Sequence, residues 1–272
     1  MNQKIILGFV IALLSLSIYV SALPSGPRTL DRSNEDRWPL WDPISTTAIA
    51  GNLTELTFNA STITRTYQGY YGNITGRIVL GDSNNLTLYD WSLYSPQGEI
   101  YAVRSALVPS WEHVSCASYP ELQSEDLRLN ANETIDEDAI NNTFVVGGAT
   151  DQAERFGAAQ LFHPQFWVAN QSITANQCPV AVMYNSTSQP SPYFKEVLLS
   201  DNTNVPVTPG TSQEGFVIYT AIIAHTLNPF AESDGFNNRN HDFEMLVGED
   251  GHGAEIGSTA TTSTYWFYVE LD

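Results

Sequence analysis

The amino-acid sequence predicts a mainly β fold, namely an antiparallel β-sandwich-like domain with a small helical insertion. Three observations lead to this prediction. Short runs rich in Val, Ile, Thr, Tyr, Phe and Trp recur along the chain, and many alternate apolar with polar residues, as half-buried strands do. The segments between these runs carry Gly, Pro, Asn, Asp and Ser, which favour turns. The pattern of helices is concentrated in one segment, at about 118–142.

The N-terminal 22 residues have the pattern of a secretion signal. Lys4 gives a short positive region, residues 5–20 form an apolar run, and Pro24 soon follows it. A membrane-spanning helix usually needs about 20 apolar residues, so this run is short for one. We expect cleavage after Ala22, which would leave no integral membrane span. The alternative is that the segment is kept as an N-terminal anchor.

Residues 23–51 are expected to form an extended arm, because Pro, Gly and charged residues occur there without periodicity. Trp38 and Trp41 could dock this arm on the domain or on a neighbouring molecule. The rest of the chain, residues 52–272, is expected to form the β domain. Its first strand is predicted at 53–64, where apolar residues alternate with Thr and Asn. Alternatively, this segment completes the sheet of a neighbouring copy.

The stretch RTYQGYYGNITGRIVLGD leads into the next strands. Its glycines are suited to places where strands bend or change sheet, and Tyr67, Tyr70 and Tyr71 can pack their rings while their hydroxyls stay wet. A structural corner is one interpretation, and a tyrosine-lined surface that binds a glycan or a partner chain is the other. Turn residues separate three further strand-like runs, an antiparallel meander: GRIVLGD, LTLYDWSLY and GEIYAVRSALV.

The helical insertion begins with residues 120–127, which have Pro near the first helical position and acids in the first turn. A second short helix is expected at 133–139. Strand-like runs then return: LFHPQFWVA, CPVAVMY, FKEVLLSD, GFVIYTAIIAH, DFEMLV and TYWFYVELD. The run GFVIYTAII is nearly all apolar, so it is expected to be a central strand covered on both faces.

Two covalent features are expected of an exported chain. The two cysteines, Cys116 and Cys178, suggest a disulfide. Closing a loop of about 60 residues would stabilise the fold by roughly 4 kcal/mol. Eight Asn-X-Ser/Thr sites are candidates for glycosylation. They are Asn52, Asn59, Asn73, Asn85, Asn132, Asn141, Asn170 and Asn185.

The chain is acidic, with 11 Lys and Arg against 30 Asp and Glu and a net charge of −19. Such a surface repels phosphate backbones and anionic headgroups, so nucleic acids and anionic membranes are not expected partners. Solubility with adaptation to salt is one explanation of the acidity, and collection of divalent cations is another.

Acidic residues are densest at 232–255. This stretch has the oxygen donors that calcium prefers, although it lacks the EF-hand spacing. The alternative to a calcium site is a pair of acidic, glycine-rich hairpin loops on either side of DFEMLV. The candidate calcium ligands are Asp234, Asn237, Asn240, Asp242, Glu244, Glu249 and Asp250.

No motif in the sequence names a reaction. The chain has no HExxH, GxSxG, P-loop or GxGxxG pattern, so no catalytic residue and no cofactor other than calcium is assigned. A pair of carboxylates for glycoside hydrolysis would leave no motif, because such a pair is defined only in space.

Several segments together resemble a group of exported archaeal proteins of unknown function. They include YQGYYGN, GRIVLGD, LYDWS, FKEVLLSD, DFEMLV and YWFYVEL, and they cover most of the chain from about residue 52. The resemblance implies a secreted or surface-displayed archaeal β protein, and it brings no catalytic residues.

We therefore expect an exported, glycosylated, non-enzymatic cell-envelope protein with a structural, filament-forming or adhesive role. Its partners would be further copies, other envelope components or glycans. The alternatives are a secreted hydrolase acting on polysaccharide or protein, and a carbohydrate- or calcium-binding module. A clustered metal site or a deep polar cleft would favour the enzyme, whereas an exposed edge strand would favour assembly.

Overall fold

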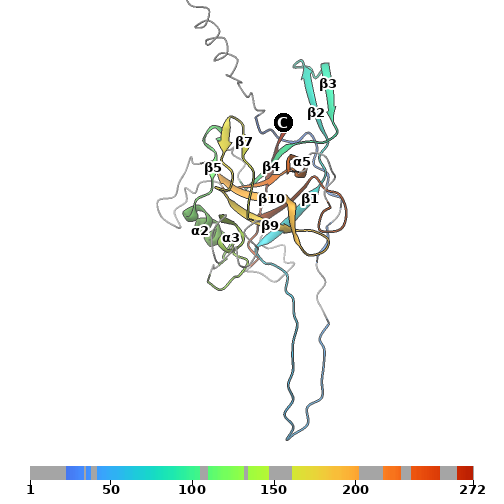
Figure 1. Cartoon of the computed structure of the whole chain (residues 1–272), viewed down its shortest axis with the longest axis vertical. Coiled ribbons are helices and arrows are strands. Elements are labelled where there is room, and N and C mark those ends of the chain that lie inside the picture. The colour runs from blue at the N-terminus through green and yellow to red at the C-terminus, as the bar shows by residue number, and fades with distance from the viewer. Residues whose placement is uncertain are drawn as a thin grey trace, which may run out of the picture.

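The structure, a computed structural model, describes residues 23–33, 35–37, 42–104, 110–131, 134–146, 161–201, 217–227, 234–251 and 262–271. Strands dominate it and the strand pairs are antiparallel, so the predicted mainly β fold is confirmed. Figure 1 shows a body of packed sheets from which a hairpin and a long loop project. Among the described residues, no helix has the length and apolar character needed to cross a membrane. The expected signal segment, Trp38 and Trp41 lie outside the described residues.

A seven-stranded sheet forms the centre of the body. The main path is β13 (Trp266–Leu271), β4 (Gly98–Val103), β11 (Val217–Ile222), β10 (Pro190–Ser200), β9 (Pro179–Tyr184) and β6 (Val145–Val146), and β5 (Ser115–Cys116) also pairs with β10. Strand β11 is buried along its whole length between β4 and β10, which confirms the prediction made from its apolar sequence. On the other side of β13, the backbone groups of Ser25 and Val269 exchange hydrogen bonds of 3.1 and 2.9 Å.

One face of the central sheet packs against a two-stranded sheet made of β1 (Tyr67–Gly72) and β12 (Phe243–Gly248). Met245 and Val247 of β12 lie in one buried cluster with Leu198 of β10 and Tyr219 of β11. Adjacent residues of a strand point to opposite faces, so Ile218 belongs to a different core from Tyr219.

The second core covers the opposite face of the central sheet. It is closed by η1 (Trp111–His113) and by the hairpin of β7 (Phe166–Val168) and β8 (Gln171–Ile173). The result is a layered, β-sandwich-like body whose middle strands are covered on both sides.

The helical insertion contains α2 (Tyr119–Arg128) and α3 (Ile140–Thr143), and the short α5 (Ala224–Leu227) follows β11. Helix α2 begins where the sequence predicts, because the Glu121 carboxylate accepts the Ser118 N–H at 2.6 Å and caps the first turn. The helix predicted at 133–139 is wrong, since residues 134–139 form turns and a bend. Asp126 explains the difference, because its carboxylate accepts the Ile140 N–H at 2.6 Å and so places the helix start there.

Two predictions about the chain before β4 are wrong. Residues 53–64 form no strand and instead belong to a loop at 42–64 that leaves the body (Figure 1). The expected meander is also broken, because β2 (Gly76–Gly81) and β3 (Thr87–Leu93) pair with each other and not with β4. An alternating segment becomes a strand only where a neighbouring strand is available to pair with it. Here β4 already lies between β11 and β13.

Candidate functional site

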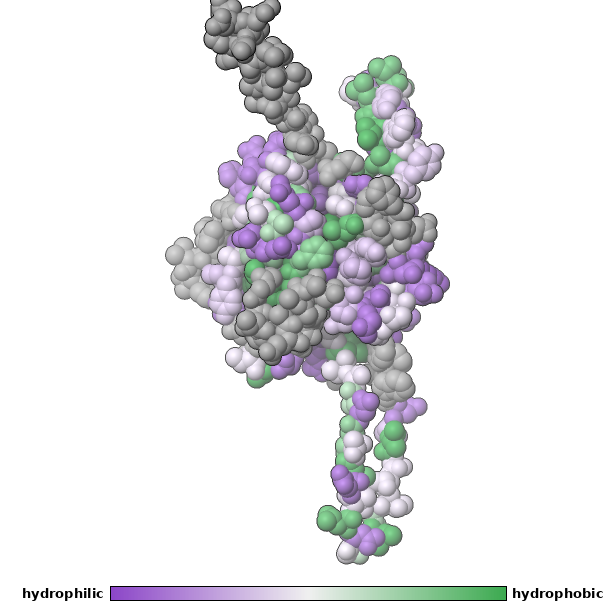
Figure 2. All heavy atoms as spheres, in the orientation of Figure 1, coloured by the Kyte–Doolittle hydropathy of each residue, from purple (hydrophilic) through white to green (hydrophobic). Residues whose placement is uncertain are grey.

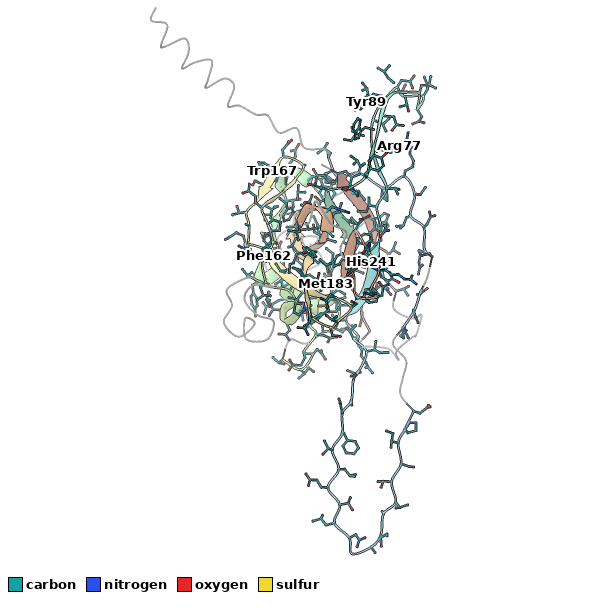
Figure 3. All side chains as sticks on the ribbon, turned by 45° about the vertical axis from the view of Figure 1, so that its right-hand side comes forward. Arg77, Tyr89, Phe162, Trp167, Met183 and His241 are labelled. Atoms are coloured by element: carbon teal, nitrogen blue, oxygen red, sulfur yellow. A yellow bond between two sulfur atoms is a disulfide. The ribbon has the colours of Figure 1, made fainter. Side chains whose placement is uncertain are left out.

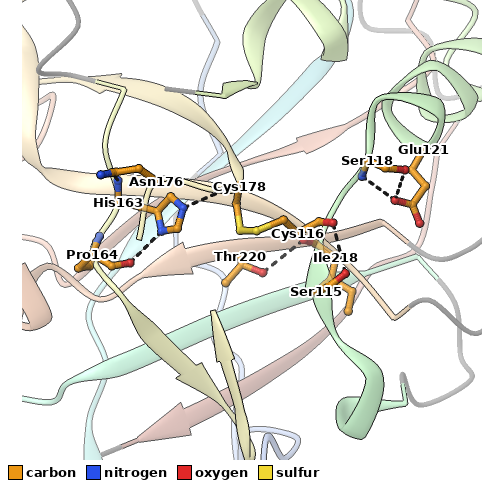
Figure 4. The surroundings of a disulfide bond; sticks show 10 residues. All are labelled: Ser115, Cys116, Ser118, Glu121, His163, Pro164, Asn176, Cys178, Ile218 and Thr220. Carbon is orange, nitrogen blue, oxygen red and sulfur yellow. Dashed lines mark hydrogen bonds between the residues drawn. A yellow bond between two sulfur atoms is a disulfide. The ribbon is translucent and has the colours of Figure 1, made fainter. Parts of the chain in front are cut away.

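The predicted disulfide between Cys116 and Cys178 is present, with 4.6 Å between the two Cα atoms (Figure 4). It joins β5 to the residue that precedes β9. Cys178 is fully buried in the core that covers the β7–β8 side of the sheet. The bond therefore fastens the segment before the helical insertion to the central sheet.

His163 lies beside this disulfide and is fully buried. Its Nε2 accepts the Cys178 N–H at 3.0 Å, and its Nδ1 lies 2.8 Å from the Pro164 carbonyl oxygen, to which it donates (Figure 4). Both ring nitrogens are thus used by the neutral imidazole, and burial lowers the pKa of His163. This is the environment of a structural histidine, not of a general base.

The three tyrosines of the YQGYYG segment each contact different side chains. The Tyr67 ring lies 6.3 Å from that of Phe144, and the Tyr70 ring lies 5.4 Å from that of Phe267. Both tyrosines pack against the core between the sheets. Tyr71 is 45% exposed and contacts Phe236, with 4.9 Å between ring centroids. The structure therefore does not line up the three rings on one surface.

The acidic stretch is used to hold turns and strand ends. Asp242 accepts the Ile74 N–H at 2.6 Å, Glu249 accepts the Ser263 N–H at 3.2 Å, and Asp250 accepts a hydrogen bond from the Asn130 side chain at 2.7 Å. Among the described residues, no group of three or more His, Cys, Asp or Glu is placed to hold a metal ion.

Of the remaining candidate calcium ligands, Asp234, Asn237 and Asn240 lie in one turn before β12, and Glu244 lies within β12. The backbone of Asp234 pairs with that of Asn240, and the Asn237 side-chain oxygen lies 2.8 Å from His241 Nε2. Glu244 accepts the Phe236 N–H at 2.9 Å, and burial raises its pKa to about 7. These contacts hold the turn before β12 and the start of β12, and a calcium site in this stretch stays a prediction.

A buried polar cluster joins α2 to the central sheet, and no sequence motif indicates it. Glu125 accepts hydrogen bonds from the Tyr219 hydroxyl at 2.8 Å and from Arg128 Nε at 2.9 Å. Burial raises the pKa of Glu125, but the positive charge and hydrogen bonds of Arg128 outweigh it, so the net pKa lies below the usual value. The cluster has the character of a structural ion pair, because each charge is matched to a partner.

The predicted glycosylation sites differ in exposure. Asn141 and Asn185 are half-buried, and Asn132 lies outside the described residues. The exposed ones are Asn52, Asn59, Asn73, Asn85 and Asn170. Asn85 lies in the turn between β2 and β3 with a φ of 62°, a conformation that Asn tolerates well.

The β2–β3 hairpin extends away from the body, as the views in Figures 1 and 3 agree. Asp82 shapes its turn, because its carboxylate accepts the N–H groups of Asn84 at 2.9 Å and Leu86 at 2.8 Å. These backbone hydrogen bonds lower the pKa of Asp82. Arg77 forms an ion pair with Asp90 across the two strands. The hairpin is therefore held by its turn and by cross-strand pairs.

One face of this hairpin is apolar and uncovered. Ile78 pairs with Trp91, and Leu80 pairs with Tyr89, so these four side chains share a face. Each is at least 50% exposed. We call these residues the hairpin face. The opposite face carries the Arg77–Asp90 ion pair.

The second projection is the loop at 42–64, which contains further exposed apolar side chains. Leu56 is 53% exposed and Phe58 is 84% exposed. Among the described residues, no backbone hydrogen bond joins residues 53–63 to another part of the chain. Figure 2 shows apolar residues on the hairpin and at the far end of the loop, at opposite ends of the body.

Runs of strand-forming residues mark both projections in the sequence, but these runs do not indicate whether their side chains are buried.

No protein-family model, curated protein or solved structure matches the chain, so the resemblance to exported archaeal proteins stays a prediction.

Proposed function

We propose that this protein is an exported, glycosylated and non-enzymatic structural subunit of the cell envelope, which associates with further copies into filaments or an adhesive layer. The observation that carries the proposal is the pair of apolar, weakly charged projections at opposite ends of one body (Figures 1 and 2).

Exposed apolar side chains and open strand edges favour unwanted aggregation unless they form a contact with a partner. Contiguous apolar patches on soluble proteins commonly mark interaction sites, and open strand edges are usually protected when they have no partner. The hairpin leaves one apolar face and both strand edges without a partner among the described residues.

The net charge supports association through the projections in particular. The whole chain has a net charge of −19, so copies of it repel one another. Residues 76–94 contain only Arg77, Asp82 and Asp90 as charged side chains, and residues 42–64 contain only Asp42 and Glu55. Contact between these segments brings few carboxylates together.

Sedimentation velocity of the exported protein over a wide concentration range tests this function. We expect a sedimentation coefficient that rises with concentration, and electron micrographs of particles longer than one copy. High salt should favour association, because it screens the repulsion between the acidic bodies. A chain that stays monomeric under all these conditions would exclude the proposed function.

Glycan binding is a second candidate, favoured by one surface feature. Tyr71 and Phe236 are 45% and 49% exposed and lie against each other with their ring planes at 79°. Exposed aromatic rings offer an apolar body and, in tyrosine, a polar handle for a sugar. Titration with envelope polysaccharide, compared between the unchanged protein and Tyr71→Ala, tests this candidate. Equal binding by the two proteins would exclude this surface.

A further inference from the structure

The β2–β3 hairpin and the loop at 42–64 both expose apolar side chains and project from opposite ends of the molecule. The β2–β3 hairpin lies at one end of the long axis and the loop at 42–64 lies at the other (Figure 1). The turned view in Figure 3, which labels Tyr89 and Arg77 on the hairpin, shows the same separation. The loop of one copy is therefore placed to meet the hairpin of another copy.

The loop carries a segment whose alternating pattern is suited to a third strand beside the two strands of the hairpin. In an extended conformation, Leu56, Phe58 and Ala60 lie on one face of residues 54–60, and Glu55, Thr57 and Asn59 lie on the other. The segment has no strand partner within its own chain among the described residues. At about 3.3 Å per residue its seven residues span about 23 Å, which matches the hairpin strands of six and seven residues.

The hairpin offers the matching receptor. Strands β2 and β3 form a two-stranded sheet, so each strand has one edge whose backbone N–H and C=O groups face outward. A third strand at either edge would widen the hairpin face and leave its polar side chains beside the Arg77–Asp90 pair. Asn59, a predicted glycan site, would then lie on the polar face, where a glycan does not obstruct the contact.

The base of the hairpin is fixed to the body by two contacts, so the hairpin edge has a defined position. The Ile74 N–H donates to the Asp242 carboxylate at 2.6 Å just before β2. A Cβ at Gly76 would lie 2.6 Å from Leu271 Cδ1, so the absence of a side chain there lets the hairpin lie close to the last strand.

We infer that residues 54–60 of one copy add as a strand to an open edge of the β2–β3 hairpin of the next copy, and extend its hairpin face with Leu56 and Phe58. This inference rests on the proposed function, because it names the contact by which the copies associate. Strand addition provides backbone hydrogen bonds and side-chain contacts together. The two contacting surfaces differ, so the association is head-to-tail and can continue into a filament.

A pair of complementary variants tests the inference. In the donor variant, Leu56→Thr and Phe58→Thr remove the apolar side chains of the loop. In the acceptor variant, Ile78→Thr and Leu80→Thr do the same on the hairpin face, while Thr keeps the β propensity of β2. Each variant alone should be monomeric. An equimolar mixture should give heterodimers and nothing larger, because only one productive contact remains.

Matched controls use the same chemistry elsewhere on the projections. Val79→Thr with Leu88→Thr changes the other face of the hairpin, and Ile44→Thr with Ile49→Thr changes the other limb of the loop. Both controls should associate like the unchanged protein. Far-ultraviolet circular dichroism and melting curves should be the same for all variants, since these side chains are exposed.

The possible outcomes separate the inference from the function. If the donor variant dimerises alone, the hairpins pair with each other and the inference is wrong. If the acceptor variant dimerises alone, the loops pair and it is wrong too. If both variants assemble like the unchanged protein, association uses another surface and only the proposed function survives. A monomeric unchanged protein would overturn both.

Discussion

At the scale of single residues, this acidic chain buries several carboxyl groups that have few charged partners. Glu196 is fully buried, and one of its oxygens accepts the Leu246 N–H at 2.8 Å. Its other oxygen has no hydrogen-bond partner among the described residues, and burial raises the pKa of Glu196 well above its usual value. Glu244 is 6% exposed and has a pKa raised to about 7 for the same reason. Both groups fit the fold better when they are neutral.

Glu244→Gln should therefore stabilise the protein at alkaline pH but not at acid pH. The pKa of Glu244 is raised in the folded state, so between about pH 4.5 and 7 the folded protein binds more protons and its stability falls as pH rises. Removal of the ionisable group should add on the order of 2–3 kcal/mol at pH 8 and almost nothing at pH 4. Urea unfolding at both pH values measures this, with Glu55→Gln on the exposed loop as the control. Equal gains at both pH values would contradict the prediction.

Loss of the disulfide between Cys116 and Cys178 should destabilise the fold. Cys116→Ala with Cys178→Ala should lower the free energy of unfolding by roughly 4 kcal/mol, because the unfolded chain is no longer constrained. Denaturant unfolding with and without reductant measures the difference, and non-reducing mass spectrometry should find the peptide that joins the two cysteines. Two alkylatable thiols in the exported protein would contradict it.

At the scale of secondary-structure elements, the strands differ in how they are supported. Strand β11 is buried along its length between two neighbours, whereas β2 and β3 pair only with each other among the described residues and have many exposed side chains. A two-stranded hairpin is at best marginally stable in water. The central sheet and the hairpin should therefore open independently.

Hydrogen exchange should reveal this difference. In the monomer, the amides of β2 and β3 should exchange far faster than those of β11, whose opening requires global unfolding. In the assembled state, protection should rise in the hairpin and in residues 54–60 together, while β7 and β8 serve as the control region. Protection of the hairpin without any change in the loop would contradict strand addition.

Glycan occupancy should follow the exposure of the elements. We expect modification at exposed sites such as Asn85 in the hairpin turn and Asn52 in the loop. Asn141 should be poorly modified, because it is half-buried and its N–H bonds to the Asp126 carboxylate at 3.2 Å. Glycopeptide mass spectrometry of the native protein measures each site, and full occupancy of Asn141 with an empty Asn85 would contradict the expected order.

At the scale of the whole molecule, the buried clusters and the proposed contact surfaces lie in different parts of the chain. The two buried clusters draw on the central sheet and on the elements that cover it. The loop at 42–64 touches this body mainly at its end, where the Thr64 hydroxyl donates to Asp138 at 2.5 Å. Residues 23–64 should therefore be dispensable for the fold.

A chain that begins at residue 65 should keep the melting transition of the body and lose the ability to associate. Among the described residues, the truncation removes the loop and the Ser25–Val269 backbone pair but no side chain of either buried cluster. Circular dichroism and sedimentation velocity measure the two properties. An unfolded product would show that the removed residues are part of the fold and not a donor segment.

Much of the fold could be predicted from local sequence. The apolar run of β11, the capped start of α2 and the pairing of only two cysteines each depend on nearby residues or on simple counting. The candidate site could be predicted only in part. The segments 53–64 and 76–94 were visible as strand formers, but their exposure was not.

The sequence by itself determined where strands can form, which one is central, and that the chain is acidic with one possible disulfide. Only the tertiary structure decided that β1 pairs with β12, that the β2–β3 hairpin stands outside the central sheet, and that Glu196 is buried. The physical reason is that a two-residue period specifies the two faces of a strand but not its neighbour. The neighbour of a strand depends on the sum of long-range contacts, and the β2–β3 hairpin, which has no such contacts on one face among the described residues, leaves that apolar face exposed.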